Sequence, residues 1–119
     1  MNMLRRRPKK ARRVDVVRCA GHKAYVRDNF LCIVPGCNRT PIQAMHIERA
    51  MDNAMSRKPS DDRVLPGCSF HHTDDGKAYH RIGREAFAKL HGLDLERLIE
   101  EINRNSGPLS RYRAKEQQP

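Results

Sequence analysis

Two short stretches decide the fold of this chain, Cys32-Ile33-Val34-Pro35-Gly36-Cys37 and Cys68-Ser69-Phe70-His71. Each stretch places two metal-ligand residues within one turn, and the Pro-Gly pair bends the first turn. Two close pairs separated by a long insert are typical of a tetrahedral zinc site, because each turn supplies two ligands and the ion ties the turns together. We therefore predict a structural Zn²⁺ that is bound by Cys32, Cys37, Cys68 and His71.

A third close pair, Cys19-x2-His22, leaves the ligand set open. It could replace a member of the set, giving a site with four cysteines, or it could bind a second ion. We interpret Cys19 as a small buried apolar residue and His22 as a helix residue that packs on a hairpin. The expected ligands of the structural zinc therefore remain the four named above.

The composition explains why a bound ion is needed. Of 119 residues, 38% are hydrophobic, and the chain has no Trp, three Phe and three Tyr. A single small domain with so few large apolar side chains buries little surface, so a metal would supply the missing stability. The sequence has no apolar run that could span a membrane and no apolar stretch behind its basic N-terminus. We expect a cytoplasmic protein without a membrane partner, in which reduced cysteines bind metal.

The net charge of +10 lies at the two ends of the chain. Residues 1–30 contain ten Lys or Arg against two acidic residues, whereas residues 31–110 balance at eleven of each. We predict a disordered basic tail over residues 1–13, a folded domain over 14–107 and a flexible basic tail over 108–119. Such tails suit a polyanion such as DNA, although a solvated tail that only raises solubility is the simpler alternative. The candidate phosphate contacts in the first tail are Arg5, Arg6, Arg7, Lys9, Lys10, Arg12 and Arg13.

A β-hairpin is predicted around a long polar loop. Residues 42–47 have the pattern of a strand, and residues 63–67 form a second short strand that runs into Cys68. The stretch from Glu48 to Ser60 between them is polar and irregular, and long irregular loops usually have a function. The two strands are expected to pair, so that the second strand leads directly to two zinc ligands.

Helices are predicted on both sides of this hairpin. Residues 22–30 fit a short helix, and residues 77–92 fit a longer one that Gly92 can end in the left-handed conformation. Asp94 is expected to cap another helix with apolar residues at helical spacing, and Gly107-Pro108 is expected to end it. The sequence therefore predicts a small α+β domain.

Three histidines and one aspartate form a second candidate site. His72 directly follows the zinc ligand His71, so the zinc turn would fix its backbone, and His46 ends the first strand of the hairpin. His80 and Asp61 lie within reach along the chain. Neutral imidazoles bind divalent first-row metals or act as a general base near pH 7, and these residues allow both roles.

These motifs follow one another in a specific order. The series is Cys32-x4-Cys37, Ala44-Met45-His46-Ile47, Lys58-Pro59-Ser60-Asp61, Leu65-Pro66-Gly67-Cys68-x2-His71-His72, His80-Arg81-Ile82-Gly83, Phe87 and His91-Gly92-Leu93-Asp94. Over residues 20–100, this order resembles the phage-type HNH nucleases, which include relatives of the phage recombination-enhancement nucleases. They belong to the ββα-metal, or HNH, endonuclease superfamily.

The resemblance implies a β-hairpin and a helix that clasp a catalytic ion beside a structural zinc. By this analogy His46 is the general base that takes a proton from the attacking water, and Asp61 orients His46 or assists the metal. His72, together with His80, would bind the catalytic ion, Mg²⁺ or another first-row metal, which polarises the scissile phosphate. The basic residues expected to hold backbone phosphates are Arg49, Arg57, Lys58 and Arg81.

The sequence departs from this family in two places. His72 and His80 are eight residues apart, which on a continuous helix separates them by about 12 Å, too far to share one ion. Either Asp74-Asp75-Gly76 breaks the helix and lets His80 return, or His80 is not a ligand; we predict the break, with Asp75 capping the next helix. The second departure is the missing asparagine of the HNH name, whose place Asp61 or Asp62 would take.

Two functions are consistent with these residues. The first is a metal-dependent endonuclease that cleaves DNA with little sequence preference, for which a recombination or replication protein is a candidate second partner. The second is a zinc-containing nucleic-acid-binding module that kept the scaffold without the chemistry. The role of His46 distinguishes them.

Overall fold

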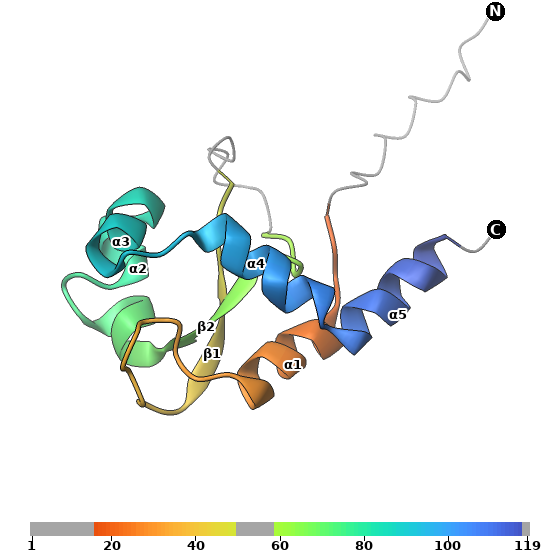
Figure 1. Ribbon diagram of the computed structural model, residues 1–119, viewed down its shortest axis with the longest axis horizontal. Helices are drawn as coiled ribbons and strands as arrows, with labels where there is room; N and C mark the ends of the chain where they lie inside the picture. The colour runs from red at the N-terminus through yellow and green to blue at the C-terminus, as the bar shows by residue number, and fades with distance from the viewer. Residues whose placement is uncertain (1–15, 50–58, 118–119) are drawn as a thin grey trace, which may run out of the picture.

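The computed structural model describes residues 16–49 and 59–117, which form five α-helices, one π-helical turn and a two-stranded sheet (Figure 1). The elements in chain order are α1 (Ala20–Asn29), β1 (Ile42–His46), β2 (Val64–Cys68), η1 (Phe70–Asp74), α2 (Tyr79–Ile82), α3 (Arg84–His91), α4 (Leu95–Arg104) and α5 (Gly107–Glu116). The predicted α+β class is confirmed over these ranges. No helix within them is long and apolar enough to cross a bilayer. The predicted basic tail over residues 1–13 and the candidate phosphate contacts Arg57 and Lys58 lie outside the described residues.

The predicted hairpin forms, with β1 and β2 antiparallel. Ile42 pairs with Cys68 at one end of the hairpin, and His46 pairs with Val64 at the other. Gly67 allows the strands to pack closely, because a Cβ there would lie 3.1 Å from Sδ of Met45. This register places the candidate zinc ligand Cys68 and the candidate base His46 at opposite ends of the hairpin.

The core lies between the hairpin and the helices. Val26 of α1, Met45 of β1, Leu65 of β2, Phe87 of α3 and Ile99 of α4 are all buried in one cluster. Every residue of β2 is buried, whereas the only fully buried position of β1 is its fourth. Packing on the helices therefore covers both faces of β2 and leaves part of β1 accessible to solvent.

The predicted long helix over residues 77–92 is in fact two helices. Gly83 has φ of 87°, a conformation that other residues rarely adopt, and it separates α2 from α3. Gly92 has φ of 64° and ends α3 in the left-handed conformation, as expected. The side chain of Asp94 accepts a hydrogen bond from the backbone N–H of Arg97, at 3.2 Å, so the predicted cap of α4 is confirmed.

The prediction of a flexible tail over residues 108–119 is wrong, because α5 occupies most of that range. Ser106 accepts a hydrogen bond from the Leu109 N–H at 3.2 Å and so caps the helix, while Pro108 stands in the first turn, where no N–H partner is needed. Leu109 is fully buried in a second small cluster with Val17 and Cys19. The Gly107-Pro108 pair, which the sequence predicts as the end of a helix, is thus also the start of α5.

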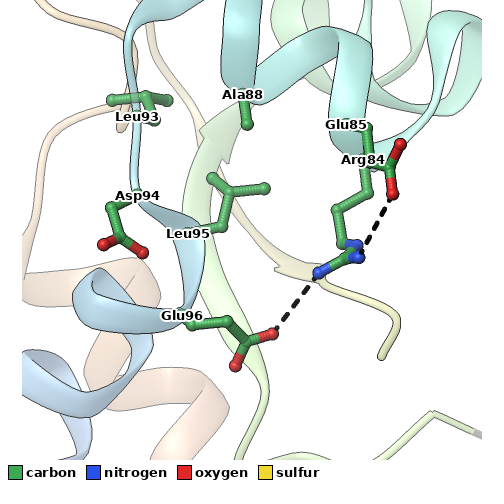
Figure 2. Close-up of a pocket in the computed structure, with 7 residues that line it drawn as sticks. All are labelled: Arg84, Glu85, Ala88, Leu93, Asp94, Leu95 and Glu96. Atoms are coloured by element: carbon green, nitrogen blue, oxygen red, sulfur yellow. Dashed lines mark ion pairs between the residues drawn. The ribbon is translucent and has the colours of Figure 1, made fainter. Parts of the chain in front are cut away.

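The corner between α3 and α4 forms an open surface cavity of about 320 Å³ (Figure 2). Arg84 reaches Glu96 at 3.6 Å and Glu85 at 3.8 Å, and Arg63 donates to Glu96 as well. Hydrogen bonding from Arg63 is the main reason why the pKa of Glu96 lies below its ordinary value. No histidine or cysteine lines this cavity, so these ion pairs support the fold rather than the candidate sites.

Candidate metal centres

The four predicted zinc ligands meet at one point. Their ligand atoms all lie within 4.8 Å of one another, and they form one group that could hold a metal ion. The Sγ atoms of Cys37 and Cys68 are 3.8 Å apart, and Nδ1 of His71 lies 3.6 Å from Sγ of Cys32 and 3.3 Å from Sγ of Cys68. Ordinary Zn–S and Zn–N bond lengths place two tetrahedral ligand atoms about 3.6 to 3.8 Å apart. The donor set and its spacing therefore fit zinc.

The pKa values of two of these residues, Cys32 and His71, also favour the binding of a cation. Burial is the main reason why the pKa of the Cys32 thiol is raised to about 11, because desolvation disfavours the thiolate. Burial also lowers the pKa of His71, followed by repulsion from His91 and Arg39. A neutral imidazole and a buried thiol whose ionisation a cation would favour are what a structural zinc site offers.

His46 and Asp61 form a hydrogen-bonded pair at the far end of the hairpin. Nε2 of His46 lies 3.0 Å from Oδ1 of Asp61, and the Asp61 side chain is buried while His46 is half-buried. Because a carboxylate can only accept, Nε2 of a neutral His46 carries the proton and Nδ1 keeps its lone pair. No described residue hydrogen-bonds to Nδ1. Asp61 thus holds His46 in the tautomer that can accept a proton.

The segment just before α1 fixes Asp61. Oδ2 of Asp61 accepts the backbone N–H of Cys19 at 2.8 Å, and the Asp61 backbone N–H donates to Val17 O at 2.9 Å. Ser60 Oγ accepts the Val17 N–H at 2.8 Å. The carboxylate therefore has a defined position before any ligand binds.

His72 and His80 bring two nitrogen atoms together. Their Nε2 atoms lie 2.9 Å apart, close to the spacing of about 3 Å expected for two imidazoles at right angles on one ion. Nδ1 of His72 lies 2.6 Å from Oε1 of Gln43, which can only accept, so Nδ1 carries the proton. Nε2 of His72 therefore presents a lone pair, which can accept an N–H from Nε2 of His80 or bind an ion. Burial, then the charges of His80 and His46, lower the pKa of His72, so the neutral ring prevails near pH 7.

The predicted helix break explains how two histidines eight residues apart can meet. η1 ends at Asp74, Asp75 is extended, and α2 begins only at Tyr79. The predicted cap by Asp75 is wrong in detail, because Ala78 precedes α2 and bonds to the backbone carbonyl of Asp75 instead. Arg81 donates from Nε to Thr73 O at 3.2 Å and braces the break.

Four other residues that the sequence analysis named also lie in the described part of the chain. Cys19 is buried outside the zinc group, with Sγ 3.7 Å from the Pro108 carbonyl, as expected of a small filler. His22 is a fully buried residue of α1, and its Nδ1 lies 2.7 Å from Ser106 Oγ. Arg49 is half-buried at the end of the first described range, and Arg81 is exposed.

Two neighbours of the candidate sites were not predicted from the sequence. Gln43, which orients His72, is an unremarkable residue in a strand, and Lys23 lies on α1 with Nζ 3.9 Å from Oδ1 of Asp61. The sequence gives no local signal for either, because their partners are 29 and 38 residues away. No protein-family model, curated protein or solved structure matches this chain.

Proposed function

We propose that this protein is a metal-dependent endonuclease of the HNH type that hydrolyses DNA phosphodiester bonds with little sequence preference. One observation carries the proposal: a carboxylate-oriented histidine, His46, shares a small domain with two histidines whose Nε2 atoms converge. Burial, then the charges of His80 and His46, lower the pKa of His72, which is consistent with the two pairs lying within electrostatic reach of each other. A protein that only binds nucleic acid needs neither the carboxylate-oriented His46 nor the converging pair His72 and His80.

His46 would act as the general base. Its Nδ1 accepts a proton from the attacking water, and Asp61 keeps the ring in place and stabilises the imidazolium that forms. Asp61 thereby takes the orienting role that the resemblance gave to it, and the missing asparagine is not needed for this step.

His72 and His80 would hold the catalytic ion through Nε2, while Gln43 fixes the ring of His72. When bound, the ion neutralises charge on the phosphate and stabilises the leaving oxygen. Two imidazoles are softer donors than the oxygen ligands that Mg²⁺ prefers, so this pair favours first-row transition metals.

A plasmid-nicking assay with metals returned one at a time tests the proposal. The purified chain, stripped of loosely held metal but still containing its zinc, should be inactive and regain nicking with a divalent ion. The half-activating concentration should be lowest for Ni²⁺, higher for Mn²⁺ and highest for Mg²⁺, in the order of affinity for nitrogen ligands. Failure of every ion to restore nicking, with DNA binding intact, would favour the non-catalytic binding module.

A further inference from the structure

Three cations from distant segments surround the loop that carries Asp61. Lys23 of α1 has Nζ 3.9 Å from Oδ1 of Asp61, and Arg113 of α5 has Nη2 3.4 Å from Oδ2 of Asp62. Arg18, just before α1, donates from Nη1 to the carbonyl of Pro59 at 2.6 Å. Figure 1 shows α1 and α5 meeting at the end of the molecule opposite α2 and α3.

The positive charge of these groups exceeds what the loop neutralises. Asp61 already accepts from His46 and the Cys19 N–H, and Asp62 accepts from Ser60 Oγ at 2.6 Å. In the described ranges no carboxylate pairs with Arg18. The Lys23 and Arg113 side chains are 32% and 51% exposed, so their ion pairs are weak and remain open to another anion.

The position of the cluster indicates its ligand. Nζ of Lys23 and Nε2 of His46 approach the same oxygen of Asp61, so a phosphate beside His46 lies within reach of the Lys23 ammonium. Arg113 and Arg18 extend the positive surface along α5 and the segment before α1. Exposed or partly exposed cations beside one histidine suit the phosphates of a nucleic-acid backbone.

We propose that Arg18, Lys23 and Arg113 form a phosphate-binding site for the DNA backbone next to His46. The proposal rests on the proposed function for its substrate, yet it concerns binding and not cleavage. It adds Arg18 and Lys23 to the contacts predicted from the sequence, and it places Arg113, which lies in the predicted basic tail over residues 108–119, on α5.

The test compares two double variants in the His46→Ala background, with binding of a labelled DNA duplex measured over a range of salt concentrations. K23Q/R113Q should raise Kd about tenfold or more and lower the slope of log K against log salt by about 1.8, since each lost phosphate contact removes about 0.9. K89Q/R97Q removes the same charge from exposed positions on α3 and α4, and it should change the slope much less. Zinc content and far-UV circular dichroism should match the parent in both variants.

The conservative variant K23R/R113K keeps both charges and should bind with the affinity and slope of the parent. Parental binding by K23Q/R113Q, or equal losses in the two neutral double variants, would overturn the phosphate site. A different outcome separates the two proposals. If the wild-type chain never nicks DNA but K23Q/R113Q selectively loses DNA affinity, the nuclease proposal is wrong and the phosphate-binding site is supported.

Discussion

Replacing Cys68 by serine is expected to cost the protein both its zinc and its cooperative fold. Cys68 is 1% exposed, ends β2 and has its sulfur close to both Cys37 and His71. Structural zinc contributes about 10 to 16 kcal/mol in small domains, as much as the whole stability of a typical protein. Metal analysis should therefore find less than one zinc per chain, and thermal unfolding should show no cooperative transition.

Cys19→Ser is the matched control for this experiment. Cys19 is also a buried cysteine, but its sulfur faces the Pro108 carbonyl and lies outside the zinc group. This variant should keep one zinc per chain and lose only about 1 to 3 kcal/mol of stability, the range of ordinary core substitutions. A Cys68→Ser protein that retains zinc and unfolds at the wild-type temperature would contradict the structural role of the metal.

Replacing His72 by alanine is expected to abolish metal-dependent nicking while the zinc-bound fold persists. The change removes one of two converging nitrogens and leaves His80 alone, and the several kcal/mol that a catalytic ion supplies correspond to about a thousandfold or more in rate. Nicking rates at increasing Mn²⁺ measure the loss of activity. Calorimetric Mn²⁺ titration of the zinc-loaded protein measures the loss of metal affinity.

Gln43→Ala is a milder variant with which His72→Ala can be compared, because a smaller loss of metal affinity or activity is expected. It keeps both metal-binding nitrogens but removes the acceptor that fixes the His72 ring, a kind of change that typically reduces metal affinity or activity 10- to 100-fold. Activity in His72→Ala equal to that of the wild type would show that this pair of histidines does not hold the catalytic ion.

The sequence predicted the parts of the molecule whose determinants are local. Cys32 and Cys37 lie in one turn, as do Cys68 and His71, so their spacing indicated the group that could hold a metal ion, although it left Cys19-x2-His22 as an alternative pair. The Asp-Gly turn chemistry of residues 74–76 likewise predicted the break that brings His72 to His80. The hairpin followed from two short apolar stretches on either side of a polar loop.

What the sequence did not predict depends on contacts between distant segments. The Gly107-Pro108 pair fits both a helix end and a helix start, and only the burial of Leu109 against Val17 shows that α5 continues the domain. Gln43 and Lys23 acquire their roles from residues that the fold brings to them. Binary patterns and turn signals carry no information about such partners.

The decisive measurement for the nuclease proposal is the rate of supercoiled-plasmid nicking by His46→Ala at a saturating concentration of the activating ion. Loss of a positioned general base should lower the rate by about 10² to 10⁴ relative to the wild type. Zinc content and DNA affinity should stay unchanged, because His46 is half-buried at the hairpin end opposite the candidate zinc ligands. Nicking by the purified variant at the wild-type rate would contradict the assignment of His46 as the base.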